Sequence, residues 1–386
     1  MDRPPSDDAE IAYPFSFVLS IDAADTPEEE RMRTLGIGII GLHHLHPMDY
    51  LTHFAALPST RVCALSEADA VLRQKAAAAT GLPVYAEYGE VLARDDVDAV
   101  FIFLPHADCP AAAAAAAEAG KHVVVEKPMA ATSDGIRRMV AAAQAAGVSL
   151  SAPFCWRYHP AARHIKEVVE GGKLGRVLAL EGRCAAGSPL RYRRDGISPW
   201  ILAKASAGGG PLHNLGVHWI DLFRWLLEDE VDTVTGMVSH EQHGLEVEDA
   251  GFALLRFAGG ATASLDISYS VPDAYPAGRD LYIGLRGTEG ALSWSPAWGG
   301  TADEVFLCSS RPEMADGPVR RVQIASRSVG GYGGICGLAY LRRLTDDLLA
   351  GRPPQVTGSD GLRALEVVEA VYTAAETGRT VRVERR

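Results

Sequence analysis

The chain has 386 residues, of which 22% are charged and 47% hydrophobic, and it carries a formal net charge of −12 at pH 7. This length allows two domains with a sizeable core, and the acidic balance argues against a nucleic-acid partner, which would need a basic face. No apolar run approaches the roughly 18–20 residues that span a bilayer, so we expect no membrane partner. Six cysteines without a C-x-x-C pair predict reduced thiols and a cytoplasmic location.

Residues 1–34 form a predicted extension, set apart from the rest of the chain by composition. Its polar, proline-bearing ends flank an apolar patch at residues 11–19. One interpretation is an extension without packed structure. The other is an arm whose aromatic side chains pack on a neighbouring subunit, because an apolar patch of this kind rarely stays in water.

From residue 35 to 152, short apolar strands alternate with helices. The predicted strands are 35–40, 61–65, 98–104, 122–125 and 149–153; the predicted helices are about fifteen residues after Gly41, 111–119 and 133–146. This alternation predicts an α/β domain with a doubly wound parallel sheet, a Rossmann dinucleotide-binding domain, with ligands at the carboxyl ends of the strands.

Residues 153–386 have a different pattern. Predicted strands at 177–184, 231–239, 250–257, 261–268 and 281–286 follow one another with hairpin turns at residues 259–260 and 287–288, and predicted helices occupy 161–170, 335–350 and 359–376. Consecutive strands of this kind predict an α+β domain with a large, mostly antiparallel open sheet.

The turn after the first strand is an incomplete dinucleotide fingerprint. Of the three glycines in G-x-G-x-x-G only Gly41 is present, and His43 and His46 replace the other two. A helix N-terminus still attracts phosphate, and His43 and His44 could add donors to it. Glu67 ends the second strand, where a carboxylate binds the ribose 2′-hydroxyl and repels a 2′-phosphate, so this residue favours NAD over NADP.

Two further segments contain candidate catalytic residues. In Glu126-Lys127-Pro128 the lysine closes a strand at the crevice edge of the sheet; it is either a solvated charge or a catalytic group that the proline holds in place. After three glycines at 208–210, Asn214 and His218 are four residues apart and share one helix face. A histidine on an apolar helix is often only a core residue, but the glycines would let a substrate or cofactor approach the backbone closely.

These motifs occur in a defined order. The glycine turn, residues 126–128, residues 156–160 (Trp-Arg-Tyr-His-Pro) and the G-G-G…N-x-x-x-H segment resemble the glucose–fructose oxidoreductase, inositol dehydrogenase and MocA (Gfo/Idh/MocA) family over roughly residues 35–384. The resemblance implies an NAD(P)-dependent oxidoreductase, with NADP less favoured, that acts on a secondary alcohol or ketone carbon of a sugar, sugar derivative or cyclitol. It also implies that the second domain binds the substrate and that its open sheet forms a homo-oligomer, a dimer or tetramer.

The resemblance also assigns roles to residues of this chain. Lys127 would hydrogen-bond the reacting hydroxyl, and His218 would be the general acid/base. Asn214 stands where many members have an aspartate; since an amide cannot titrate, it would only orient His218 or the substrate. The residues implied for cofactor binding are Gly41, His43, His44, Glu67, Leu104, Pro105, His106, Glu126, Lys127 and Pro128. Those implied for substrate binding are Lys127, Arg157, Tyr158, His213, Asn214 and His218.

Three other interpretations stay open. Family members sometimes use a bound, recycled NAD for a net non-redox reaction, such as glycoside cleavage or epimerisation. The incomplete turn is also compatible with a cofactor-free binding or regulatory protein on a degenerate scaffold, although such a protein would not need Lys127 and His218. A metal site built from the histidines is disfavoured, because neighbouring histidines point apart and no H-E-x-x-H spacing occurs; we expect no metal.

Overall fold

The computed structural model describes residues 34–384 apart from positions 190, 195–197, 273, 276–277, 297–301 and 326–327. Residues 1–33 of the predicted extension lie outside the described residues. Within the described part, no helix combines the length and apolar character needed to cross a membrane.

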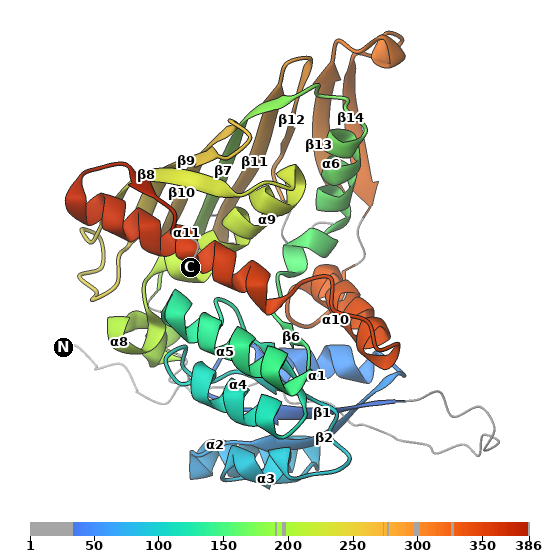
Figure 1. The fold of residues 1–386 in the computed structure, drawn as a ribbon, viewed down its shortest axis with the longest axis vertical. Helices are drawn as coiled ribbons and strands as arrows, with labels where there is room; N and C mark the ends of the chain where they lie inside the picture. Colours follow the sequence, from blue (N-terminus) through green and yellow to red (C-terminus); the bar gives the residue numbers. More distant parts are fainter. Residues whose placement is uncertain are drawn as a thin grey trace, which may run out of the picture.

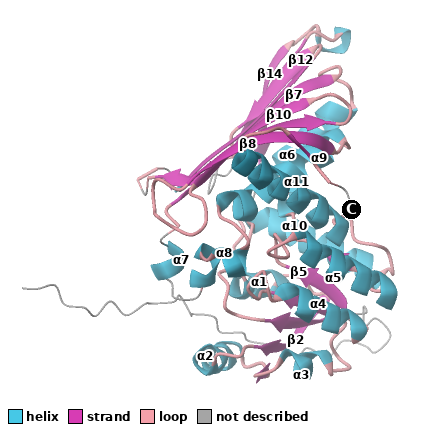
Figure 2. Ribbon diagram, turned by 60° about the vertical axis from the view of Figure 1, so that its left-hand side comes forward, coloured by secondary structure: helices cyan, strands magenta, loops and turns pink. Residues whose placement is uncertain are grey.

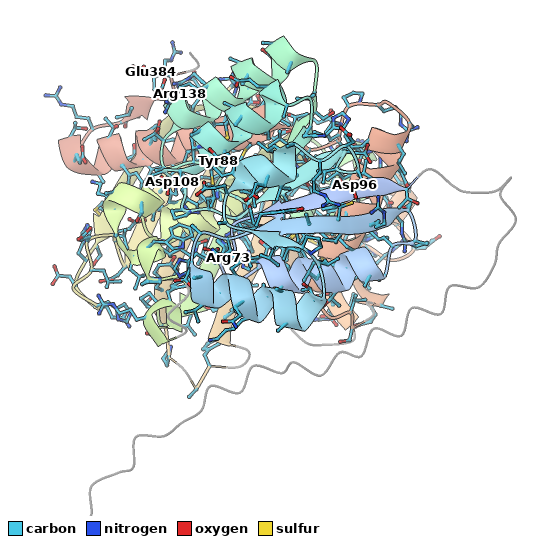
Figure 3. All side chains as sticks on the ribbon, turned by 90° about the horizontal axis from the view of Figure 1, so that it is seen from below. Arg73, Tyr88, Asp96, Asp108, Arg138 and Glu384 are labelled. Carbon is cyan, nitrogen blue, oxygen red and sulfur yellow. The ribbon has the colours of Figure 1, made fainter. Side chains whose placement is uncertain are left out.

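The N-terminal domain is built on a six-stranded parallel sheet (Figure 1). Its spatial order is β3 (Val84–Tyr85), β2 (Thr60–Ser66), β1 (Leu35–Ile40), β4 (Ala99–Ile102), β5 (His122–Val125) and β6 (Leu150–Ser151). Helices α1 (Pro47–Ala55) and α2 (Ala70–Thr80) cover one face, and α3 (Tyr88–Leu92), α4 (Cys109–Glu118) and α5 (Ser133–Ala146) cover the other (Figure 3). The order of the strands reverses between β1 and β4, so a ligand is expected outside their carboxyl ends.

The two ends of this sheet are marked by labelled side chains in Figure 3. Arg73 and Asp108 lie at the carboxyl-end edge: the Nη1 of Arg73 donates to the carbonyl oxygen of Glu67, 2.7 Å away, and Asp108 precedes α4. Asp96 lies at the opposite edge, where its carbonyl oxygen is so close to Gly36 that an added Cβ would stand 1.9 Å from it. Motifs that follow β1, β4 and β5 therefore converge on the edge of Arg73 and Asp108.

The C-terminal domain contains a nine-stranded sheet in which all neighbours are antiparallel except β7 and β10. Its spatial order is β14 (Val319–Ala325), β13 (Ala302–Ser309), β12 (Gly290–Trp294), β11 (Arg279–Gly287), β7 (Val177–Gly187), β10 (Thr262–Val271), β9 (Ala250–Phe257), β8 (Val231–Ser239) and β15 (Val381–Arg382). Helices α6 (Pro160–Glu170), α9 (Val217–Leu227) and α11 (Gly358–Thr377) lie on one face, and no described helix covers the other (Figure 2).

The longest helix, α11, packs against both domains (Figure 1). Its Glu369 accepts hydrogen bonds from the backbone N–H and the hydroxyl of Ser133 at the start of α5. On the other side Val371 lies so close to Gly236 of β8 that an added Cβ would stand 2.7 Å from it. Helix α10 (Gly334–Leu349) contacts α1 as well. The two domains therefore share one continuous set of packed helices.

Short helices complete the segments between these elements. They are η2 (Cys155–Tyr158), α7 (Arg191–Arg194), η3 (Pro199–Leu202), α8 (Lys204–Ala207), η4 (Leu212–Gly216) and η6 (Pro312–Met314).

The fold-class prediction is confirmed in both halves, with local differences. The helix expected directly after Gly41 begins only at Pro47, because residues 43–46 continue as bends and the proline then starts the helix at its first position. The helix expected to carry Asn214 and His218 begins with a π-helical turn, η4, before α9. Strands β12, β13 and β14 were not predicted, and they extend the sheet beyond β11.

Candidate active site

A cavity of about 550 Å³ lies where the carboxyl-end edge of the parallel sheet meets the second domain. Its wall on the first domain includes His44, His46 and Lys127. The second domain contributes Tyr192, Asn214, His218 and Arg279, and the loop before α10 and its first turn contribute residues 328–329 and 331–336. Of the predicted site residues, His44, Lys127, Asn214 and His218 are thus brought together on one cavity.

Lys127 is a buried amine at the end of β5, joined to Pro128 by a cis peptide bond. Its Nζ donates to Asn214 twice, over 2.7 Å to the side-chain Oδ1 and over 3.0 Å to the backbone oxygen. Burial lowers the pKa of Lys127 from its usual value, and the nearby Glu126 carboxyl opposes this effect. With two positions of its nitrogen directed at Asn214, Lys127 keeps one position for a ligand in the cavity, an N–H when charged or a lone pair when neutral.

His218 lies on α9, and its buried Nδ1 has no hydrogen-bond partner among the residues that the structure describes. Burial lowers the pKa of His218 well below its usual value, and the charge of Lys127 lowers it further. The imidazole is therefore neutral near pH 7, with one nitrogen as donor and the other as acceptor. An unpaired nitrogen on a residue of the cavity wall indicates a ligand that would satisfy it.

The triple glycine before η4 serves packing within the protein. A Cβ at Gly208, Gly209 or Gly210 would stand 2.4 Å from the oxygen of Ala131, 2.1 Å from the hydroxyl of Tyr372 and 2.3 Å from the oxygen of Glu248, respectively. The expectation that these glycines admit a substrate or cofactor to the backbone is therefore corrected: they admit neighbouring protein groups, and so fix the start of the segment that carries Asn214 and His218.

His213 does not line the cavity. Its Nε2 donates to the carbonyl oxygen of Ala130 over 3.0 Å, and burial lowers the pKa of His213 to about 4. Because a carbonyl oxygen only accepts, this contact places the ring proton on Nε2. The side chain of His213 thus lies in the core, where it joins η4 to the segment that follows β5.

Arg157 and Tyr158 also lie off the cavity wall. Arg157 forms a paired contact with the buried Asp221 of α9, with Nε 2.8 Å from Oδ2, and a further bond of 2.8 Å to Asp360 at the start of α11. The hydroxyl of Tyr158 lies 3.4 Å from the side-chain oxygen of Gln355. The structure places both residues in contacts that join elements of the fold.

The glycine turn is closed by contacts within the protein. Gly41 has φ +84°, and Glu67, buried at the end of β2, accepts the N–H of Leu42 over 2.6 Å and that of Asp69 over 2.8 Å. The Nδ1 of the buried His44 accepts the N–H of His46 over 3.2 Å. The side chains of Glu67 and His44 thus bind backbone N–H groups of this turn and of the segment that follows it.

Trp200 of η3 covers this turn from the second domain. Its Nε1 donates to the carbonyl oxygen of His43 over 2.6 Å, and its ring lies 5.8 Å from that of His44 and 4.8 Å from that of His106. His106 is also buried, and its Nδ1 lies 2.8 Å from the carbonyl oxygen of Ala207. The loop of residues 104–106 after β4 is therefore fixed by residues 200–207.

Glu126 lies beneath the cavity, against α1. The hydroxyl of Tyr50 donates to it over 3.3 Å, and the Nδ1 of His46 lies 3.4 Å from its other oxygen. Burial raises the pKa of Glu126. The ring of His46 stacks on Tyr332 at 3.9 Å, so Glu126 supports the cavity wall from behind.

Sequence reasoning missed Tyr192, Trp200 and Arg279. Tyr192 and Trp200 lie between the predicted strand 177–184 and the glycines at 208–210, and Arg279 lies between the predicted strands 261–268 and 281–286, where no motif marks them. Only their contacts in the folded chain identify them.

The residues fit a dinucleotide both where its ribose and where its nicotinamide would lie. Glu67 stands at the end of β2, where a ribose is bound, and the amine of Lys127 and the unpaired Nδ1 of His218 belong to the cavity where a nicotinamide and a substrate would meet. Between the two ends, His43 and His46 stand at the glycine positions of the fingerprint, and Trp200 contacts this turn from the second domain. Among the described residues there is no group of three or more histidine, cysteine, aspartate or glutamate side chains that could hold a metal ion.

Comparison with known proteins places both halves of the chain in one family. Residues 31–154 match the model of the oxidoreductase family with an NAD-binding Rossmann fold, and residues 162–293 match the GFO/IDH/MocA C-terminal domain. The chain is 31% identical over 293 residues to dTDP-3,4-didehydro-2,6-dideoxy-alpha-D-glucose 3-reductase of Streptomyces violaceoruber, covering 76% of this chain and 81% of that protein. It is 29% identical over 360 residues to inositol 2-dehydrogenase 2 of Saccharopolyspora erythraea, covering 91% and 96%.

A solved structure supports the same assignment. The crystal structure of aldose-aldose oxidoreductase from Caulobacter crescentus, complexed with glycerol, superposes with a TM-score of 0.77 at 28% identity. The match covers 91% of this chain and 100% of that one.

Proposed function

We propose, on the premise that this chain belongs to the GFO/IDH/MocA oxidoreductase family with its NAD-binding Rossmann fold, that it transfers a hydride between a nicotinamide dinucleotide and a secondary alcohol or ketone carbon of a sugar, sugar derivative or cyclitol. The observation that carries the proposal is the shared cavity of Lys127, Asn214 and His218 at the switch point of the parallel sheet. The names of the two relatives, a reductase of a dTDP-linked sugar and an inositol dehydrogenase, support sugars and cyclitols as the substrate class.

Lys127 and His218 have different roles in the proposed reaction. A bound nicotinamide dinucleotide would supply the acceptor for the hydride of the alcohol carbon. The remaining position on the nitrogen of Lys127 holds the reacting oxygen, and the neutral imidazole of His218 takes the hydroxyl proton. In the reverse direction His218 returns that proton to the oxygen as the ketone is reduced. Asn214 holds Lys127 and transfers no proton.

We propose NAD as the preferred cofactor, because of Glu67. Its carboxylate ends β2, where a 2′-phosphate would meet negative charge at close range. Titration with NADH and with NADPH tests the preference: tighter binding of NADPH would contradict it.

A homo-oligomer through the uncovered sheet face is also proposed. Met237 on β8 is 70% exposed, Phe252 and Leu254 on β9 are 47% and 63% exposed, and Met237 pairs directly with Phe252. These side chains point away from α11, because Gly236 next to Met237 faces Val371. A second copy of the chain would cover this apolar strip, and light scattering after size exclusion measures whether the particle is larger than one chain.

The deciding experiment begins with the cofactor. The purified protein is unfolded gently, the released molecules are identified by mass spectrometry, and NADH binding is followed by fluorescence. Activity is then measured on a panel of sugars and cyclitols with wild-type protein, Lys127→Met, and Lys75→Met as a control on the exposed part of α2. Saturable NADH binding with activity lost only in Lys127→Met supports the proposal. Absence of any nucleotide binding, or an active Lys127→Met, would overturn it.

A further inference from the structure

The side-chain amide of Asn214 is held at both of its ends by buried groups. Its Oδ1 accepts from Lys127 over 2.7 Å. Its Nδ2 donates over 3.0 Å to the hydroxyl of Tyr192 on α7 and over 2.8 Å to the hydroxyl of Tyr269 on β10. Both tyrosines are buried, and their rings lie 6.2 Å apart, edge to face.

This arrangement permits one orientation of the amide. The carbonyl oxygen of an amide only accepts and its nitrogen only donates, whereas a phenol can accept. If the amide turned over, Nδ2 would face the N–H groups of Lys127, and one good hydrogen bond would be replaced by two donors in contact. The two phenols oppose this rotation, because each accepts one of the two hydrogens of Nδ2.

We propose that Tyr192 and Tyr269 are positioning residues for the proposed reaction: by holding the nitrogen end of the Asn214 amide, they keep its oxygen on Lys127 and so direct the remaining position of the lysine nitrogen at the substrate. This inference rests on the proposed function and adds two residues that act through Asn214. An amide keeps the same donors and acceptor at every pH, whereas burial lowers the pKa of Lys127, so the protonation of this amine is the quantity to measure.

Other groups around Lys127 also influence the pKa of its amine. Glu126, Tyr192 and Cys155 favour its protonated form, and Arg279 opposes it. The imidazoles of His44, His106, His213 and His218 also face it, and burial lowers the pKa of each. Substituting either tyrosine by phenylalanine leaves the Glu126 carboxylate, the Arg279 guanidinium and these imidazoles in place.

The test measures the proton on Lys127 directly, in protein freed of nucleotide. Acetic anhydride labelling over a range of pH, read by mass spectrometry of the peptide with Lys127, gives the midpoint at which the amine becomes reactive. In Tyr192→Phe/Tyr269→Phe the amide is free to turn and the ammonium loses an acceptor, so we expect this midpoint to fall by about one pH unit. Asn214→Asp places a carboxylate on the same nitrogen, and we expect the midpoint to rise by about one pH unit or more.

Tyr340→Phe is the matched control, because it removes a buried phenol hydroxyl that bonds Ser151 away from this group. A double variant that unfolds like Tyr340→Phe but keeps the wild-type midpoint would overturn the inference. If the double variant does not fold, Tyr192→Phe alone and Asn214→Asp decide: unchanged midpoints in both refute it. Since the labelling needs neither cofactor nor substrate, its outcome is separate from the nucleotide-binding test of the proposed function.

Discussion

Replacing Arg157 by methionine tests whether this residue braces the fold or binds a substrate. In the structure its guanidinium neutralises Asp221, which is 1% exposed, and also bonds Asp360. Removing one partner of a buried ion pair leaves the other charge uncompensated, which costs about 3–5 kcal/mol. We therefore expect Arg157→Met to lower the melting temperature by something of the order of 10 °C.

The pH dependence of that loss is a second result of the same experiment. Burial raises the pKa of Asp221 even with Arg157 present, and without the guanidinium the pKa rises further. The folded variant then binds a proton more readily than the unfolded chain, so its stability deficit should shrink as the pH falls from 8 to 5.

Scanning calorimetry across this pH range measures both effects. Arg163→Met is the control, because Arg163 is exposed and only packs its charge over the Tyr158 and Trp225 rings. A melting temperature of Arg157→Met close to wild type, together with a raised substrate KM, would refute the structural role of Arg157 and support its predicted role in substrate binding.

Three more results are expected. Lys127→Met should lower kcat by about 10²–10⁴-fold, the range of acid–base and charge-assisted groups, with little change in the affinity for NADH; equal losses in both would contradict its assigned place. Acidification should destabilise the protein between pH 6.5 and about 4, because His213 takes up a proton in this range when the chain is unfolded but not when it is buried in the folded protein, and His218 acts in the same direction. A melting temperature that does not change from pH 7 to 5 would contradict this. Gly210→Ala should disrupt the loop before η4, because its Cβ would lie 2.3 Å from the backbone oxygen of Glu248; soluble protein with wild-type melting would contradict the packing.

The regular elements were predictable where local pattern determines them. The helix at 133–146 agrees residue for residue, because Thr132 caps its start and Gly147 ends it with φ +68°. Strands β13 and β14 escaped prediction, since β14 carries the exposed Arg320 and Arg321 and resembles a solvated loop. The fold class could therefore be predicted from the sequence, but not the full width of the second sheet.

The site was predictable only where a residue stands inside a short motif. Lys127 and His218 do, and both reach the cavity. Arg157 also stands in a motif, but its partners lie 64 and 203 residues away, and no local pattern reveals an ion pair across such distances. The contact of Trp200 with the glycine turn spans 157 residues and escaped prediction for the same reason.

The contacts of Glu67 have a consequence for redesigning the proposed preference for NAD. An engineer who wanted a 2′-phosphate accepted would replace this carboxylate first, yet its two oxygens hold the N–H groups of Leu42 and Asp69. The same substitution would remove both hydrogen bonds, so it would change the cofactor selectivity and destabilise the loops after β1 and β2 at the same time. Ala68, exposed beside the guanidinium of Arg73, offers a starting point that leaves these two bonds intact.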